Sequence, residues 1–150
     1  PQNITQVHFI KLRLFDTKGK EVANTFYWRS NDKYEGRKTL TGPTSSGFED
    51  LSKLKQVQLK TRYQTYQEGD RHFIKAEIKN PSSTVAFFTQ LQLLGQDKKP
   101  VRPSFYTDNF FSLLPGESKT VIIETAASDM PSEPTFVVKG WNIKPSSFKL

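Results

Sequence analysis

The sequence predicts an all-β protein whose short antiparallel strands pack as a two-layer sandwich, and three observations predict it. Apolar residues alternate with polar ones at a period of two rather than 3.6 along most of the 150 residues. Turn signals made of glycine, proline, asparagine and aspartate recur about every 8 to 12 residues. No stretch has the length and period of a helix that could connect parallel strands, which disfavours a parallel α/β sheet.

Residues 1–30 are predicted to form a β-hairpin. Ile10, Leu12 and Leu14 lie on one face of the first strand, and basic residues alternate with them. A glycine-containing turn at residues 16–20 leads into a second alternating run of similar length. Because a two-stranded hairpin is only marginally stable in water, it must pack against another part of a protein.

Residues 31–55 are predicted to be a linker. Glycine, proline, serine and asparagine interrupt every periodic pattern there. Near its end, Phe48, Leu51 and Leu54 are spaced three residues apart, which predicts one or two amphipathic helical turns. We expect this short segment to attach the linker to a neighbouring surface.

Residues 56–150 are predicted to form a complete sandwich of six or seven short strands, the pattern expected of an immunoglobulin-like fold. The alternation indicates that each sheet has one solvated face. The strand after the first turn begins at His72, which is predicted to be an exposed edge residue. The expected core positions are Val57, Leu59, Thr61, Tyr63, Ile74, Ala76, Ile78, Phe87, Thr89, Leu91, Leu93, Val121, Ile123, Val137, Trp141 and Ile143.

The composition offers little for catalysis. The chain has no cysteine and two histidines, which excludes disulfides, thiolate metal sites and a cysteine nucleophile. Neither a phosphate-binding loop nor a dinucleotide-binding glycine motif occurs. Nearly all carboxylates lie in turns, where solvated polar side chains are the default. The sequence therefore predicts no metal, no cofactor and no catalytic residue in this chain.

The positive charge does not favour nucleic-acid binding. Twenty-two basic against 15 acidic residues give a formal net charge of +7. The first 55 residues hold 10 basic and 6 acidic side chains and the rest hold 12 and 9, so the excess is spread along the chain. A nucleic-acid interface would gather these charges into one patch. No apolar run approaches the roughly 20 residues of a membrane span, and none is expected.

An unusual cluster of polar residues lies within a run of aromatic ones. Tyr106, Asp108 and Asn109 precede Phe110 and Phe111, although aspartate and asparagine are poor strand formers. One interpretation is structural: the polar side chains hydrogen-bond at a bulge or strand switch, with both phenylalanines in the core. The other is a rim that contacts a sugar. We favour the structural interpretation, because strained polar positions more often serve the fold.

The two tryptophans receive different predictions. Trp141 lies within the last strand pattern and is predicted to be buried in the sandwich. Trp28 lies at the end of the hairpin, and we expect it, together with Phe48, to contribute to an interface between domains.

Three segments resemble a known family. Residues 11–28, KLRLFDTKGKEVANTFYW, resemble the closing hairpin of an immunoglobulin-like domain in family 2 glycoside hydrolases, in the β-mannosidase and exo-β-glucosaminidase branch. Residues 44–51, TSSGFEDL, resemble the linker that follows it. The most specific match is residues 105–117, FYTDNFFSLLPGE, which resemble the Ser-Asp-Asn-Tyr and Leu-Leu-Pro-Gly-Glu stretch of the C-terminal domain.

The resemblance implies that this chain is a non-catalytic accessory region of a multidomain exo-acting β-glycosidase. It would comprise the terminal hairpin of an upstream immunoglobulin-like domain, a linker and a C-terminal sandwich. The catalytic carboxylates of the family lie on an upstream (β/α)₈ barrel. The expected partners are that barrel and neighbouring domains of the same polypeptide, and an oligosaccharide if Tyr106, Asp108 and Asn109 help to wall the substrate cleft. Family analogy also implies an extracytoplasmic location.

Two alternatives remain open on the residues alone. An autonomous carbohydrate-binding module would need two or three exposed aromatic side chains in one plane. A partner-binding immunoglobulin-like domain would need only an exposed surface of suitable chemistry, which the sequence does not exclude.

Overall fold

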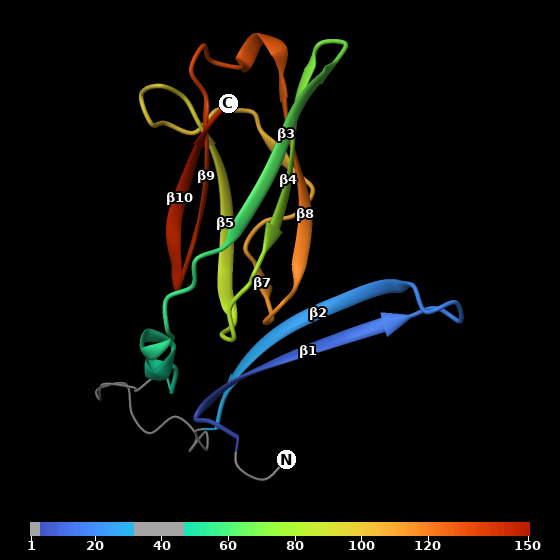
Figure 1. The fold of residues 1–150 in the computed structure, drawn as a ribbon, viewed down its shortest axis with the longest axis vertical. Helices are drawn as coiled ribbons and strands as arrows, with labels where there is room; N and C mark the ends of the chain where they lie inside the picture. Colours follow the sequence, from blue (N-terminus) through green and yellow to red (C-terminus); the bar gives the residue numbers. More distant parts are fainter. Residues whose placement is uncertain (1–3, 32–46) are drawn as a thin grey trace, which may run out of the picture. The chain divides into compact units, whose positions relative to one another are not determined.

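The computed structural model describes residues 4–31 and 47–150, and strands make up most of the described chain (Figure 1). The chain divides into two compact units, Pro1–Leu54 and Lys55–Leu150. The first contains a two-stranded sheet and the second contains two four-stranded sheets. Much of the predicted linker lies outside the described residues.

The first unit contains the predicted hairpin. Strand β1 (Val7–Phe15) pairs antiparallel with β2 (Glu21–Ser30). The carboxylate of Asp16 accepts hydrogen bonds from two backbone N–H groups of the turn, at 2.9 and 2.8 Å, which holds the chain reversal. Gly19 has a φ of +77°, a left-handed conformation that glycine adopts at little cost.

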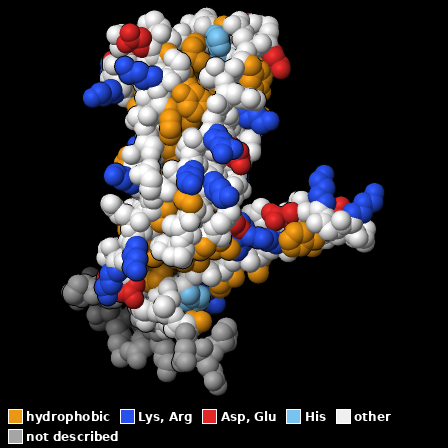
Figure 2. Space-filling model, in the orientation of Figure 1, with side chains coloured by type: hydrophobic (Ala, Val, Ile, Leu, Met, Phe, Trp, Pro, Cys, Tyr) orange, Lys and Arg blue, Asp and Glu red, His pale blue; other side chains and the backbone are white. Residues whose placement is uncertain are grey.

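One face of the hairpin is apolar and open. Leu12 and Leu14 lie on the same face of β1 and are 57% and 62% exposed. Figure 2 shows hydrophobic side chains along the hairpin. Isolated apolar residues on a surface are ordinary, whereas these two leucines are neighbours on one strand face.

A short helical segment ends the first unit, as the spacing of apolar residues predicts. A single 3₁₀ helix, η1, covers Glu49–Lys53. Its central Leu51 is buried, at 8% exposure. The side chain of Lys53 pairs with Asp50 one turn earlier, at 2.6 Å.

The second unit is the predicted immunoglobulin-like sandwich (Figure 1). All strand neighbours in both of its sheets pair antiparallel. In spatial order, one sheet is β3 (Lys60–Glu68), β4 (Arg71–Lys79), β8 (Ser118–Ala126) and β6 (Phe105–Tyr106). The other is β10 (Ile143–Lys149), β9 (Thr135–Gly140), β5 (Ala86–Leu94) and β7 (Phe111–Leu113). A second 3₁₀ turn, η2, covers Ala127–Asp129.

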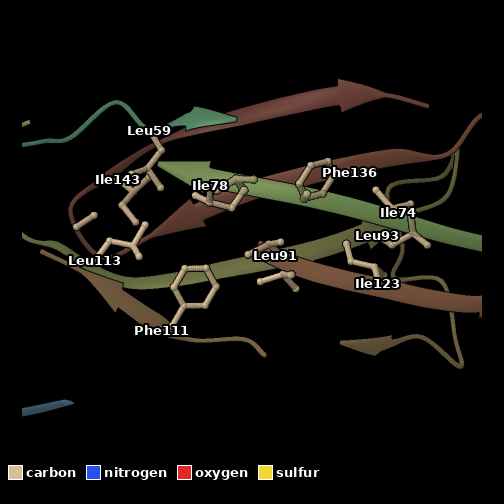
Figure 3. Packing of buried hydrophobic residues seen from close by; sticks show 14 of the residues in the cluster. Leu59, Ile74, Ile78, Leu91, Leu93, Phe111, Leu113, Ile123, Phe136 and Ile143 are labelled. Atoms are coloured by element: carbon tan, nitrogen blue, oxygen red, sulfur yellow. The ribbon is translucent and has the colours of Figure 1, made fainter. Parts of the chain in front are cut away.

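The hydrophobic core lies between these two sheets (Figure 3). Alternate residues of β4, β5 and β8 are buried, which confirms the predicted inward faces of these strands. Aliphatic side chains from facing sheets meet in the middle of the sandwich, where their burial supplies the main driving force for folding. The most deeply buried large side chains are Phe136, Ile74, Ile78, Leu91, Leu93, Ile123, Val57, Val121 and Val138.

The segment before β3 starts in the other sheet. Val57 forms a parallel bridge with Ile143, at the start of β10. Its N–H donates to the carbonyl of Asn142 at 2.8 Å, and its carbonyl accepts from the N–H of Lys144 at 2.9 Å. The chain then crosses to β3. The predicted strand face beginning at Val57 is therefore divided between two sheets, and Tyr63 on edge strand β3 is 38% exposed.

The predicted core face of the last strand pattern is wrong at Val137 and Trp141, whereas Ile143 is buried at 4% exposure as predicted. Phe136 and Val138 are buried at 0% and 1% exposure, whereas Val137 is only partly buried. Because side chains alternate, a shift of one residue exchanges the inner and outer faces of a strand. Trp141 lies outside both strands, in the turn between β9 and β10, and is 58% exposed instead of buried.

The predicted position of His72 is also wrong. It lies in β4, which pairs with β3 on one side and β8 on the other, so it is not on an edge strand. Its side chain is partly buried. The local pattern could not show this, because β8 is contributed by a segment about 50 residues later in the chain.

Candidate functional site

The cluster of polar and aromatic residues singled out in the sequence is a sheet switch. Strand β6 pairs with β8 in one sheet, and β7 pairs with β5 in the other. Residues 107–110 carry the chain between them. Thr107 holds the chain against β8 at the point where it leaves β6. Its N–H donates to the carbonyl of Ile122, and its Oγ1 accepts from the N–H of Ile122, both at 3.0 Å. We call residues 106–111 the switch segment.

Asn109 replaces a missing backbone partner for β5. Its Oδ1 accepts from the N–H of Leu91 at 2.8 Å, and its Nδ2 donates to the carbonyl of Leu91 at 3.0 Å. The carboxamide thus makes the two bonds that a neighbouring strand would make. A backbone group left unpaired inside a protein costs free energy, which explains an asparagine at this position.

Tyr106 joins the two sheets. It belongs to β6, and its hydroxyl oxygen accepts from the N–H of Leu93 in β5 at 2.9 Å. Partial burial of the ring raises the pKa of the phenol above its ordinary value of 10.0, and the hydrogen bond from Leu93 offsets part of that rise.

We expect Tyr106→Phe to lower the free energy of unfolding by about 1 to 2 kcal/mol, because the N–H of Leu93 loses its acceptor. The same variant should change the alkaline limb of the pH–stability curve. A phenol whose pKa is raised in the folded state contributes stability below pH 10 that is lost as the pH rises through the folded-state pKa. Urea unfolding between pH 7 and 11 measures both effects, with Tyr27→Phe in the hairpin as the control. An unchanged alkaline limb would contradict the prediction.

Asp108 has a partly exposed carboxylate in the switch segment. Its Oδ1 accepts from the N–H of Asn109 at 2.7 Å, and its other oxygen pairs with the ammonium group of Lys119. That ammonium also lies over the ring of Phe111, 5.2 Å from its centroid. The carboxylate side chain remains 39% exposed. Tyr106 and Asn109 use their polar atoms to hydrogen-bond to β5, whereas the carboxylate of Asp108 is partly exposed. Of the three residues predicted to contact a sugar, Asp108 therefore has the most accessible polar group.

The two phenylalanines that end the switch segment have opposite environments. Phe111 is in the core at 9% exposure, as predicted. Phe110 is 49% exposed, so the prediction that it is buried is wrong. Phe110 lies just before β7, where its φ of 57° turns the chain and leaves its ring on the surface.

The two predicted interface residues lie in the first unit. Trp28 pairs with Phe9 across the hairpin and is 41% exposed. Phe48 precedes η1 and is partly buried. Their role at a domain interface stays a prediction.

Three exposed aromatic side chains form a group that the sequence reasoning missed. They are Phe88, Phe110 and Trp141, at 38%, 49% and 58% exposure, and we call them the aromatic cluster. Two signals in the sequence could have found them. In each pair of adjacent phenylalanines, strand alternation can bury only one ring, and Trp141 is flanked by Gly140 and Asn142, which are typical of a turn.

Asn142 was also missed. Its Oδ1 accepts from the N–H of Phe87 at 2.8 Å, while its Nδ2 donates to the carbonyls of Lys55 and Val85 at 2.9 and 2.8 Å. It is 4% exposed. No local signal marks an asparagine whose partners are 55 to 87 residues away.

The switch segment offers binding chemistry rather than acid–base chemistry. Its only carboxylate, Asp108, is paired with a lysine. Within residues 4–31 and 47–150, no three histidine, aspartate or glutamate side chains are placed to hold a metal ion. The same residues include no helix long and apolar enough to cross a membrane. Lysine and arginine side chains are scattered over the face of the sandwich seen in Figure 2.

Comparison with protein families finds a match that covers most of the chain. A family model described as "Exo-beta-D-glucosaminidase Ig-fold domain" matches residues 39–143. The exo-beta-D-glucosaminidase of Streptomyces avermitilis is 30% identical over 149 residues, covering 93% of this chain and 16% of that protein. The exo-beta-D-glucosaminidase of Amycolatopsis orientalis is 28% identical over 150 residues, covering 93% and 14%.

Solved structures share the fold. The crystal structure of the Amycolatopsis orientalis exo-chitosanase CsxA superposes with a TM-score of 0.84 at 24% identity, covering 99% of this chain and 19% of that one. A complex of the same enzyme with PNP-beta-D-glucosamine gives a TM-score of 0.82 with the same coverage. The chain thus spans less than one fifth of the proteins it resembles.

Proposed function

The chain belongs to the Ig-fold domain family of exo-beta-D-glucosaminidases, and from this membership we propose that it is a non-catalytic accessory β-sandwich of a multidomain exo-acting β-glycosidase. The family match over residues 39–143 carries this proposal. The relatives extend far beyond the matched region, because the chain covers 16% and 14% of their lengths. The proposed role is to support the catalytic barrel of the longer polypeptide.

We propose β-linked glucosamine, rather than mannose, as the sugar on which the longer polypeptide acts. The sequence resemblance left both sugars open. Both curated relatives that match the chain are exo-beta-D-glucosaminidases, which favours the glucosaminide. Specificity for the sugar would be determined by the catalytic domain.

The hairpin is proposed to complete an upstream immunoglobulin-like domain. Leu12 and Leu14 present an apolar row that is more than half exposed. Strands β1 and β2 make up the whole described sheet of this unit, and three or more strands are needed for independent stability. Additional strands of the longer polypeptide would cover the apolar face.

The switch segment is proposed to face the substrate cleft. The support is the partly exposed carboxylate of Asp108, which lies beside Lys119. The other two predicted contact residues, Tyr106 and Asn109, hydrogen-bond to β5 with their polar atoms. We therefore assign them to positioning the segment and assign the sugar contact to Asp108.

Steady-state kinetics on p-nitrophenyl β-D-glucosaminide and β-D-mannoside tests this function. We expect the full-length polypeptide to cleave the glucosaminide, and the 150-residue chain alone to cleave neither sugar. In the full-length polypeptide, Asp108→Asn should raise KM by about three- to ten-fold with little change in kcat, as the loss of one charge-assisted contact to bound substrate predicts. The matched control is Asp97→Asn, which removes another exposed Asp–Lys pair.

Three outcomes would contradict parts of the proposal. Cleavage by the 150-residue chain alone would contradict the non-catalytic assignment. A preference of the full-length polypeptide for the mannoside would contradict the sugar. Equal effects of Asp108→Asn and Asp97→Asn on KM would contradict the proposal that the switch segment faces the cleft.

The alternative function is an autonomous carbohydrate-binding module, and the aromatic cluster is the observation that favours it. Calorimetric titration of the 150-residue chain with chito- and manno-oligosaccharides discriminates between the two. The accessory role predicts no saturable heat at millimolar ligand. Saturable binding that is lost on Trp141→Ser would support the alternative.

A further inference from the structure

The solvent-facing side of strands β3 and β4 carries a group of basic residues. Ile74, Ala76 and Ile78 are buried, so the residues that alternate with them in β4 face the solvent. The residues of β3 that lie opposite these share the same face. The opposed pairs are Lys60 with Lys79, Arg62 with Glu77, and Gln64 with Lys75. We call the four basic members, Lys60, Arg62, Lys75 and Lys79, the basic patch.

The charges of the basic patch are not neutralised within the described part of the chain. None of its four residues forms an ion pair there, although other basic side chains of the same unit do. All four side chains are exposed. Lys60 and Lys79 are directly opposite each other, an arrangement of like charges that destabilises a sheet. The stability of the fold therefore does not explain this placement.

Protection of a sheet edge explains only half of the basic patch. Charged residues on an edge strand discourage its pairing with another chain, and Lys60 and Arg62 lie on edge strand β3. Lys75 and Lys79 lie on β4, which is paired with β3 on one side and with β8 on the other. These two lysines have no edge to protect. A bound anion would account for all four positions.

A hollow lies within the basic patch and brings several kinds of polar group together. Its volume is about 340 Å³, within the range of about 300 to 1,000 Å³ that is usual for small-molecule sites. Two of its basic side chains stand beside an amide, a hydroxyl and a carboxylate. The lining residues are Arg62, Tyr63, Gln64, Lys75, Glu77 and Thr120.

These groups fit a sugar that carries a carboxylate. The planar guanidinium of Arg62 can donate two parallel hydrogen bonds to a carboxylate. Gln64 and Thr120 can donate to and accept from sugar hydroxyls, and the carboxylate of Glu77 can accept from them. An acidic sugar presents both an anionic group and several hydroxyls, so it uses every polar group of the hollow.

The same hollow does not fit a nucleic acid. Single-stranded nucleic acids bind where exposed aromatic side chains can stack on their bases. The aromatic residue of the hollow is Tyr63, whose hydroxyl donates to the carbonyl of Lys149 at 2.9 Å and whose ring lies 5.9 Å from that of Phe136. Glu77 would in addition repel a phosphate backbone.

We propose that the basic patch binds an acidic polysaccharide, with one carboxylate-bearing sugar in the hollow and further carboxylates of the same polymer on Lys60 and Lys79. Such a polymer differs from the substrate proposed above, because glucosamine carries an amino group that becomes cationic on protonation and a basic patch repels it. The inference therefore concerns a second class of glycan and does not rest on the accessory function. Its role would be to hold the longer polypeptide on an acidic matrix.

Binding of the full-length polypeptide to fluorescently labelled alginate, a polysaccharide of carboxylate-bearing sugars, tests the inference. Arg62→Gln combined with Lys75→Gln should weaken binding by about tenfold or more, because two charge-assisted contacts are lost. The matched control is Lys18→Gln combined with Lys20→Gln, which removes two charges from exposed side chains of the hairpin turn. Arg62→Lys retains the charge but not the paired donors, and it should weaken binding by about threefold.

The outcomes separate a built site from a general attraction of opposite charges. Weakening by the basic-patch variants that exceeds that of the control supports the proposal, and equal weakening by the two double variants overturns it. Unchanged binding by Arg62→Lys overturns the assignment of the hollow. Tighter binding of an oligothymidylate with the same number of charges overturns the polysaccharide as the ligand. Cleavage of p-nitrophenyl β-D-glucosaminide should be unchanged in all of these variants, so the accessory function is tested separately.

Discussion

Asn142→Ala is expected to destabilise the sandwich by about 3 to 5 kcal/mol, because it leaves several buried backbone groups without partners. The side chain is 4% exposed and makes three hydrogen bonds. They join the turn after β9 to Phe87 in β5, to Val85 just before β5 and to Lys55 at the start of the second unit. Its removal would loosen three segments simultaneously.

Urea unfolding of the 150-residue chain measures this loss. The control is Gln58→Ala, whose exposed side chain makes a single hydrogen bond to Ser146 at 2.9 Å. Losing one exposed hydrogen bond should cost about 1 kcal/mol or less. If Asn142→Ala destabilises the protein no more than this control, the carboxamide does not hold the turn in the way we infer.

Phe136→Ala is expected to cost about 3 to 5 kcal/mol, the usual range for removing a buried phenylalanine ring. The side chain is fully buried, at 0% exposure. Its ring lies 5.4 Å from that of Phe148 and 5.9 Å from that of Tyr63, so the substitution would open a cavity and remove two aromatic contacts. Against a typical total stability of about 5 to 15 kcal/mol, this loss is large.

The adjacent residue is the matched control for Phe136. Val137 lies on the opposite face of β9 and is partly exposed, so Val137→Ala should cost about 1 kcal/mol or less. Denaturant midpoints of the two variants compare the faces directly. A larger effect at Val137 would mean that the strand has the opposite register.

Local patterns predicted many of the strands correctly. In β4, Ile74, Ala76 and Ile78 alternate with polar residues, so only one face could be buried, and Ile74 and Ile78 lie in the core as expected. The hairpin was equally clear, because its turn contains a glycine between two alternating runs. Either a bulge or a strand switch was predicted from the presence of Asp108 and Asn109 among residues that favour strands.

The errors occurred where apolar residues are adjacent. The run Phe136, Val137, Val138 satisfies alternation in either register, and the wrong one places Trp141 in the core. Phe110 and Phe111 pose the same ambiguity, which the left-handed backbone of Phe110 resolves in favour of exposure. Periodicity carries no information about which of two neighbouring apolar residues faces inward.

The sequence by itself determined the all-β class, the antiparallel sandwich and the family, because strand periodicity, turn residues and motif spacing are properties of short segments. Tertiary structure alone decided which strands are neighbours, where the chain changes sheets, and which backbone segments hydrogen-bond to the side chain of Asn142. Those outcomes depend on contacts between segments far apart in the chain, such as Asn142 with Lys55. Which of the possible strand pairings forms is decided only when the whole sandwich folds around one core. The aromatic cluster forms at the same time.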